Sequence, residues 1–291
     1  MPRLAAFRTA ASAGLGLAGA SVATFLLSSC GSPGGPVDRA RRALEDGRTH
    51  EAWTLAGEAV AAEPNSAEAW VCRARAGLRT FRTAEAMAAA DRAIALDSLR
   101  ADAHLTRAYI FQRQFRNVAA NKCADRAAEL APGEVRMHVA RGELHLGGGV
   151  VGTADYDVAT AAFREALRLD ARSPRARLGL ARTLVAQAQD DEAMTILDGL
   201  LADRPFHGEG HYLRGVVRMR NREMERAAVD FERAVRYLAD PAPARFNLAR
   251  VLDRLGKSEQ ALAARGDYPQ ARLRAEEINF ARGRFHSEQP F

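Results

Sequence analysis

The sequence predicts an all-α protein, an α-solenoid of about seven antiparallel helix pairs stacked along the chain. Aromatic residues make up only 7% of the 291 residues while alanine recurs throughout, which favours closely packed helices over strands. Small residues also return with a period of 34 residues, which is the length of a helix pair with its two turns. Finally, 47% of the residues are hydrophobic, so the chain can bury a sizeable core.

Residues 1–29 carry the features of a secretory signal peptide rather than those of the solenoid. Arg3 and Arg8 give the segment a positive start, and no acidic residue precedes Asp38. The apolar stretch from Ala10 to Leu27 is diluted by glycine and serine. Because a membrane span needs about 20 strongly apolar residues, the stretch indicates a cleaved leader.

The leader ends in the sequence LSSC, in which two small residues separate Leu27 from Cys30. This pattern resembles the lipobox of bacterial lipoproteins, which implies a diacylglycerol on the Cys30 thiol and cleavage just before it. Residues 30–36, rich in glycine, serine and proline, would form a flexible tether. We therefore expect a lipid-anchored protein of the cell envelope. An aspartate directly after the cysteine would resemble an inner-membrane retention signal, and Gly31 at this place favours the outer membrane, facing the periplasm. The alternatives are an ordinary signal peptide and an uncleaved anchor.

Residues 37–265 form the predicted solenoid, in which each repeat contributes a first and a second helix. Helix axes approach closely only where side chains are small. First helices carry a small residue at position 8 of the repeat, namely Ala40, Ala74, Ala108, Gly142, Ala181, Gly215 and Ala249. Second helices carry one at position 20, namely Ala52, Ala86, Ala120, Ala159, Ala193, Ala227 and Ala261. Pro64, Pro132 and Pro205 fall at position 32, where proline ends a second helix.

Larger residues are expected to fill the space between the helices: Trp70, Phe111, Leu130, Phe163, Leu184, Leu197, Phe231, Leu248 and Leu252. Two places depart from the period. The glycine-rich segment from Leu146 to Asp157 lengthens the fourth repeat by about five residues and is predicted to be an extended turn. Residues 266–291 are predicted to contain a capping helix from Gln270 to Arg282, followed by a tail.

This 34-residue pattern resembles the tetratricopeptide repeat family, whose members form a right-handed superhelix with a concave groove. In that family, positions 2, 5, 9, 12 and 13 of the first helices face the groove. The resemblance therefore implies a partner-binding set of Val71, Arg75, Arg79, Leu105, Tyr109, Arg113, Arg182, Tyr212, Val216, Arg220, Phe246, Arg250 and Arg254. Apolar anchors and arginines able to hold carboxylates alternate in this set.

Two short motifs bear on catalysis and metal binding. The sequence GKS at Gly256–Ser258 lacks the upstream glycine of a phosphate loop, because Val251 stands in its place, so we predict a turn. His207 and His211 are four residues apart, but glycines and Pro205 surround them at a predicted helix start. A metal site is therefore disfavoured at these two histidines.

The remaining histidines and cysteines are interpreted as packing residues. His104, His138 and His211 share position 4, and successive repeats are too far apart for one metal ion to bridge them. Cys72 and Cys123 lie on helices of neighbouring repeats that cannot approach within disulfide distance, so both are expected to be small buried residues.

The net charge of +6 does not indicate nucleic-acid binding, because acidic and basic residues are interspersed and no basic run occurs. All but two of the 42 basic residues are arginine, as in proteins from GC-rich genomes. We expect a non-enzymatic adaptor without a cofactor, binding envelope proteins or peptides. The alternative is an accessory lipoprotein that regulates an enzyme or binds glycan or peptidoglycan through Tyr109 and Tyr212. The partner, the process and the oligomeric state stay open.

Overall fold

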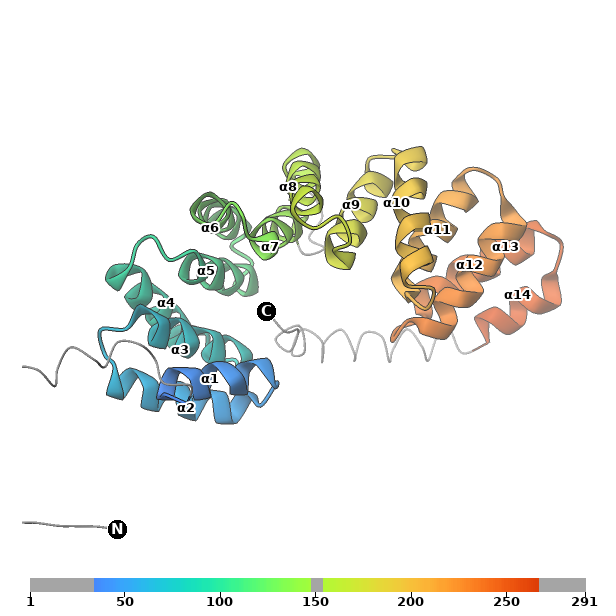
Figure 1. The fold of residues 1–291 in the computed structure, drawn as a ribbon. Coiled ribbons are helices and arrows are strands. Elements are labelled where there is room, and N and C mark those ends of the chain that lie inside the picture. The colour runs from blue at the N-terminus through green and yellow to red at the C-terminus, as the bar shows by residue number, and fades with distance from the viewer. Residues whose placement is uncertain (1–33, 148–153, 267–291) are drawn as a thin grey trace, which may run out of the picture.

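The computed structural model describes residues 34–147 and 154–266, and within these residues all regular structure is helical (Figure 1). The helices run as α1 Pro36–Glu45, α2 Thr49–Ala62, α3 Ala67–Arg79, α4 Thr83–Leu96, α5 Ala101–Arg113, α6 Asn117–Leu130, α7 Val135–His145, α8 Tyr156–Leu169, α9 Pro174–Ala186, α10 Asp190–Asp203, α11 Gly208–Arg220, α12 Met224–Tyr237, α13 Ala242–Arg254 and α14 Ser258–Arg265. The predicted signal peptide, Cys30 and the predicted capping helix lie outside the described residues.

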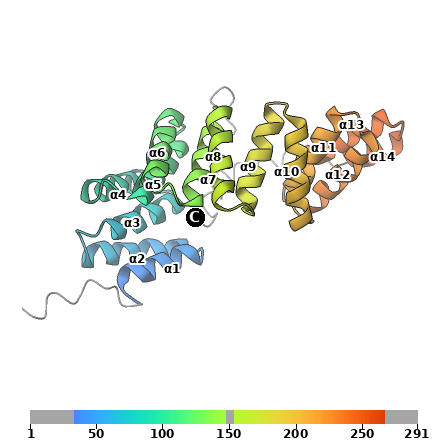
Figure 2. The ribbon, with the colours of Figure 1, turned by 45° about the horizontal axis from the view of Figure 1, so that its top comes forward.

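The helices pack as seven consecutive pairs, α1 with α2 through α13 with α14. Each second helix also packs against the first helix of the next pair. Figure 2 shows the pairs following one another in a single curved stack from α1 to α14. The α-solenoid predicted from the 34-residue period is therefore confirmed. In the described part of the chain, none of the helices has the length and apolar character needed to cross a membrane.

The small residues at positions 8 and 20 lie where the two helices of a pair cross. All seven residues at position 20 are buried, as are all seven at position 8. Most of the predicted larger residues are buried between them, including Phe163, Leu184, Leu197 and Phe231 at 0% exposure. Close approach of the axes thus depends on small side chains at fixed positions, as the sequence predicts.

The size of the residue at position 24 sets the size of the residue at position 8. The fully buried ring of Phe163 lies against Gly142 of its own repeat and against Gly179 of the next. The Phe231 ring lies against Gly215 of its own repeat. In both repeats a ring occupies the space that a side chain at position 8 would take.

Each first helix ends in a turn, and in six of the repeats the residue at position 15 of this turn has a positive φ. Glycine occupies this position at Gly47 and Gly256, with φ of 73° and 72°. The latter confirms that the GKS motif begins in a turn. Four repeats place another residue in this left-handed conformation: Phe81, Phe115, Ala188 and Arg222.

The turns between repeats are fixed by the side chain at position 4. Helices α2, α6 and α10 each end two residues before a proline, as predicted. The carbonyl at position 32 then accepts a hydrogen bond from the position-4 side chain six residues later. The pairs are Trp70 with Pro64 at 2.8 Å, His104 with Ser98 at 2.9 Å, His138 with Pro132 at 2.8 Å, Arg177 with Ala171 at 2.9 Å and His211 with Pro205 at 2.9 Å.

The predicted extended turn of the fourth repeat is shorter than its sequence range. Helix α8 already includes Tyr156 and Asp157. The Asp155 amide donates to the His145 carbonyl at 2.8 Å, and the Asp155 side chain caps α8 by accepting from Val158. Residues 148–153 are not among the described residues.

Candidate partner-binding groove

The first helices form the inner side of the curved stack. Successive first helices, such as α3 with α5 and α9 with α11, contact one another, whereas the described second helices make no comparable contact with each other. Elements on the inside of a curve lie closest together, and Figure 1 shows α5 and α7 on the inner side with α6 and α8 on the outer side. The groove expected from the sequence therefore lies along the first helices.

A series of ion pairs, here called the groove ladder, connects neighbouring repeats along this inner side. Each pair joins position 9 of one repeat to position 2 of the next. The ladder consists of Arg41 with Glu68 at 3.5 Å, Arg75 with Asp102 at 3.3 Å, Glu143 with Arg175 at 2.8 Å, and Arg182 with Glu209. Two arginines of the predicted binding set, Arg75 and Arg182, are thus engaged within the chain.

Three residues of the predicted set are buried. Val71 and Leu105 are 2% and 3% exposed and belong to the core between the helices. Arg79 is 5% exposed, and its guanidinium donates to the Leu44 carbonyl at the end of α1. Burial removes all three from the surface that a partner can reach, which corrects the assignment made from their positions in the repeat.

Arg113 repeats the role of Arg79 one repeat later. Its guanidinium donates to the Leu78 carbonyl at 2.6 Å and lies 4.3 Å from the centre of the Phe81 ring. Arginine at position 13 therefore ties the end of one first helix to the end of the preceding one. Tyr109 is partly buried and packs with the core on either side of α5.

The C-terminal part of the groove differs because neither ladder position is charged there. Between the sixth and seventh repeats, the ladder positions hold the uncharged Val216 and Pro243. At the other gap in the ladder, between the third and fourth repeats, position 9 is Tyr109 and position 2 is Arg136, which pairs with Asp102. The Phe246 ring is 44% exposed, and the Arg250 guanidinium lies 5.6 Å from its centre. Arg254 is exposed one turn further along α13.

Two more predicted residues border this part of the groove. The Tyr212 hydroxyl accepts a hydrogen bond from Asn247 at 3.4 Å, and burial raises the pKa of its phenol. Arg220 is exposed and pairs with Asp190 at 2.7 Å. The C-terminal groove, defined by Tyr212, Val216, Phe246, Arg250 and Arg254, is therefore an apolar surface with arginines at its border.

A buried charge cluster lies behind this region, centred on Asp230, which is 0% exposed. Its carboxylate accepts from Arg214 at 2.8 and 3.0 Å and from Arg218 at 2.7 Å, and lies 3.1 Å from Nδ1 of His211. Burial opposes ionisation of Asp230, but the hydrogen bonds from His211 and Arg214 and the charges of Arg214 and Arg218 hold its pKa below the usual range. The cluster ties α11 to α12.

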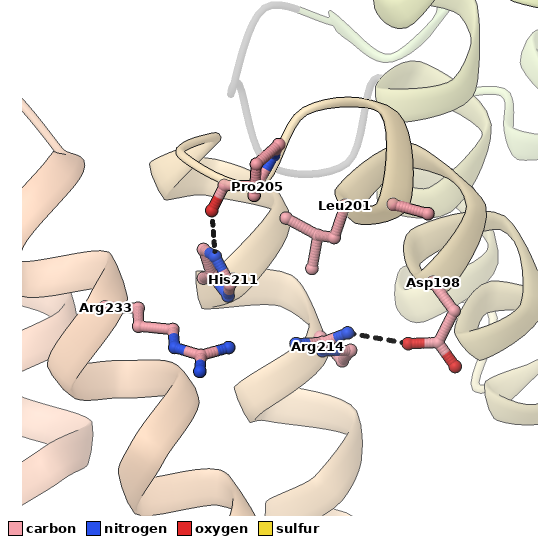
Figure 3. Close-up of a pocket in the computed structure, with 7 residues that line it drawn as sticks. Asp198, Leu201, Pro205, His211, Arg214 and Arg233 are labelled. Atoms are coloured by element: carbon pink, nitrogen blue, oxygen red, sulfur yellow. Dashed lines mark hydrogen bonds and ion pairs between the residues drawn. The ribbon is translucent and has the colours of Figure 1, made fainter.

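A hollow of about 300 Å³ opens beside this cluster, between α10, α11 and α12. Figure 3 shows Arg214 bonded to Asp198 and His211 bonded to the Pro205 carbonyl at its wall. Because these polar groups already satisfy one another, we assign the hollow a structural role.

The histidines and cysteines considered as chemical groups have structural roles. The His207 ring caps α11 by accepting from the Gly210 amide at 3.1 Å. Cys72 and Cys123 are both free thiols; Cys72 is buried as predicted, whereas Cys123 is only partly buried. Burial raises the pKa of Cys72 to about 11, which disfavours the reactive thiolate. Over residues 34–147 and 154–266, no three histidine, cysteine or acidic side chains come together as metal ligands.

A curved stack of helix pairs with its groove on the inner side defines the class of α-solenoid scaffolds for protein–protein interaction. Residues 37–104 and 152–216 match models of the tetratricopeptide repeat. These two segments are therefore tetratricopeptide repeats, as the 34-residue period predicts. A search of curated proteins found no significant match.

Solved structures of tetratricopeptide repeat proteins share the fold at low sequence identity. YrrB, described as having an unusual peptide-binding site, has a TM-score of 0.53 at 18% identity over 65% of this chain and 95% of its own. PilF of Pseudomonas aeruginosa has a TM-score of 0.60 at 17% identity over 70% and 92%. PilW, a type IV pilus biogenesis factor, has a TM-score of 0.60 at 19% identity over 70% and 94%.

Proposed function

We propose that this protein is a lipid-anchored adaptor of the bacterial cell envelope that holds a protein or peptide partner in its C-terminal groove. It carries out no catalysis of its own and serves to place that partner near the membrane. The scaffold class rests on the fold and on the repeat family. The anchor, the envelope location and the partner are what we propose in addition.

The observation that carries the docking role is the end of the groove ladder at Val216 and Pro243. Upstream of this point, charged groove residues are paired within the chain, so a ligand would have to displace existing ion pairs. At the C-terminal groove, Phe246 offers 44% of its surface beside Arg250 and Arg254. An apolar anchor flanked by arginines suits a peptide that carries both a hydrophobic side chain and a carboxylate.

The sequence before Pro36 supports the anchor. A positive start, an apolar stretch and LSSC follow one another in the order of a lipoprotein leader. The neighbours described as a peptide-binding protein and as a pilus biogenesis factor are compatible with a docking role at the envelope. Attachment to the outer membrane, facing the periplasm, is part of the same proposal, because position 31 is glycine and not the aspartate that would resemble an inner-membrane retention signal.

Crosslinking in the native envelope, followed by partner identification, tests the docking role. We expect Phe246→Ala with Arg250→Glu to abolish the crosslinked partner. Phe206→Ala is the matched control, because Phe206 is 72% exposed but lies in a turn between repeats. Retention of the partner by the Phe246 and Arg250 double variant would contradict the assignment of the groove.

Mass spectrometry of the mature N-terminus tests the anchor independently. The proposal expects acylated Cys30 as the first residue, whereas an uncleaved chain would begin at Met1. The glycan-binding alternative predicts that tyrosines stack on sugar rings. Tyr109 and Tyr212 instead pack against the core clusters and are partly buried, so no observation favours this alternative.

A further inference from the structure

Two phenylalanines occupy backbone positions that favour glycine. Phe81 and Phe115 stand at position 15 with φ of 63° and 58°, the place that Gly47 and Gly256 fill in the first and last repeats. A bulky side chain is uncommon in the left-handed region because its Cβ crowds the backbone. Strain of this kind, where it occurs outside the core, points to a function for the side chain.

The two rings do not offset the strain by packing in the core. Phe115 is 80% exposed and Phe81 46% exposed, and Val118, one turn after Phe115, is 73% exposed. The stack of Arg113 on Phe81 places the end of α5 beside the turn between α3 and α4. Phe81, Phe115 and Val118 therefore lie on one edge of the second and third repeats, here called the aromatic edge.

Basic residues surround this edge. From Arg113 to Ala124 the chain has three basic residues, the other two being Arg116 and Lys122, and no acidic one. Arg116 and Lys122 are both exposed. On the side of Phe81, the Arg82 guanidinium lies 3.9 Å from the Glu85 carboxylate. The edge therefore has one carboxylate and four basic groups, which belong to Arg82, Arg113, Arg116 and Lys122. The edge combines protruding apolar side chains with a net positive charge.

An anionic lipid surface fits these properties better than a folded protein does. The aromatic side chains project outward from tight turns, so the edge is a set of protrusions rather than a hollow that receives a side chain of a protein partner. A bilayer interface deforms around such side chains, takes up aromatic rings at headgroup depth and attracts arginine and lysine to its phosphates.

We infer that the aromatic edge is a membrane-contact site, at which Phe81, Phe115 and Val118 insert into the interface of an anionic phospholipid bilayer. Arg116 and Lys122 bind the lipid phosphates beside them. This contact goes beyond the proposed docking role and does not depend on the lipid at Cys30. It would orient the solenoid on the membrane, with the C-terminal groove several repeats away.

A tryptophan reporter in the full chain tests the inference. Val118→Trp is measured with vesicles of phosphatidylethanolamine and phosphatidylglycerol carrying brominated acyl chains, after subtraction of the signal from Trp53 and Trp70. Leu99→Trp is the control, because Leu99 is 67% exposed in the turn at the other end of α4. Helix α4 has 14 residues and is about 20 Å long, so Leu99 lies about that far from the end of α4 at which Phe81 stands.

We expect quenching at Val118→Trp, little at Leu99→Trp, and loss of the difference in phosphatidylcholine vesicles. The reporter is then combined with Phe81→Gly and Phe115→Gly. This pair should remove the quenching while the melting temperature stays the same or rises, because glycine relieves the positive φ. Ala188→Gly with Arg222→Gly makes the same backbone change in the fifth and sixth repeats and should leave the quenching unchanged.

Three results would overturn the inference. They are absence of quenching at Val118→Trp, equal quenching at Leu99→Trp, and quenching that survives the Phe81 and Phe115 double variant. Each can occur whether or not the C-terminal groove binds a partner, so failure here is distinguishable from failure of the proposed function.

Discussion

Replacing Gly142 by alanine tests whether the residue at position 8 must be glycine where position 24 of the repeat holds an aromatic ring. A Cβ at Gly142 would lie 2.7 Å from Cε1 and Cζ of Phe163 and 2.9 Å from Cε2. Carbon atoms in contact are normally about 3.5–4.0 Å apart, so the new atom overlaps the ring by about 1 Å. The ring is fully buried and meets Gly179 as well, so it has no free space to move into.

The expected magnitude follows from two opposing effects. Replacing a mid-helix glycine by alanine stabilises a helix by about 1 kcal/mol. Overpacking a filled core costs about 1–3 kcal/mol, and the enclosed ring places Gly142→Ala in the upper half of that range. We expect the free energy of unfolding to fall by about 1–2 kcal/mol, which lowers the melting temperature by about 2–8 °C in a domain of this size.

Gly199→Ala supplies the matched control in thermal unfolding followed by circular dichroism. Gly199 is also inside a helix, but nothing lies within 4 Å of an added Cβ, so this variant should gain about 1 kcal/mol. Combining Gly142→Ala with Phe163→Leu recreates the Ala181 and Leu197 combination of the fifth repeat and should recover part of the loss. The reasoning is refuted if Gly142→Ala raises the melting temperature as Gly199→Ala does.

Three further predictions concern polar contacts. Asp230→Asn should lower the free energy of unfolding at pH 7 by about 3–5 kcal/mol, because it leaves buried arginine charge without its carboxylate. Since the folded-state pKa of Asp230 is lowered, this advantage of the wild type exists above the unfolded pKa of about 3.9 and is lost as pH falls further. Urea titrations of both proteins at pH 7 and below pH 4 check it. The prediction is contradicted if the difference in free energy of unfolding between them is the same at both pH values. Arg113→Met should cost about 1–2 kcal/mol in thermal unfolding by removing the bond to Leu78 and the stack on Phe81, and an unaltered melting temperature would count against that tie. Trp70→Phe keeps an aromatic ring but removes the donor to Pro64, so we expect a loss of about 0.5–1.5 kcal/mol in urea unfolding, and no loss would mean that the bond is not needed.

The helix pairs could be predicted from the sequence because their determinants recur in register. Alanine at position 20 and proline at position 32 act through size and backbone geometry, which do not depend on distant residues. The same register placed Phe246 and Arg250 on the inner side, where the structure has them exposed. The period therefore predicts the side of the stack on which a residue lies.

Accessibility within that side could not be predicted from position alone. Arg79 and Arg113 have groove positions, yet their long side chains turn back to carbonyls of the preceding repeat. The groove ladder did leave a signal in the sequence. Opposite charges 27 residues apart, as in Arg75 with Asp102 and Arg182 with Glu209, are the spacing from position 9 to position 2 of the next repeat.

Strain at position 15 left a signal as well. Gly47 and Gly256 at equal places in the period mark a turn that needs a positive φ, so the residues other than glycine at that place can be found in the amino-acid sequence, and Phe81 and Phe115 are the large apolar ones among them. The capping role of His207 and the bond of His211 to Pro205 were not visible in this way. They depend on the conformation of the turn between α10 and α11, which the spacing of the two histidines does not specify.

The groove ladder also makes the curvature of the stack dependent on ionic strength. Its partly exposed charges are screened over about 8 Å at physiological ionic strength, so added salt relaxes the attraction that draws neighbouring repeats together on the inside of the arc. The radius of the arc would then be larger at high salt and smaller in dilute buffer, except between the third and fourth and between the sixth and seventh repeats, which no pair of the ladder joins.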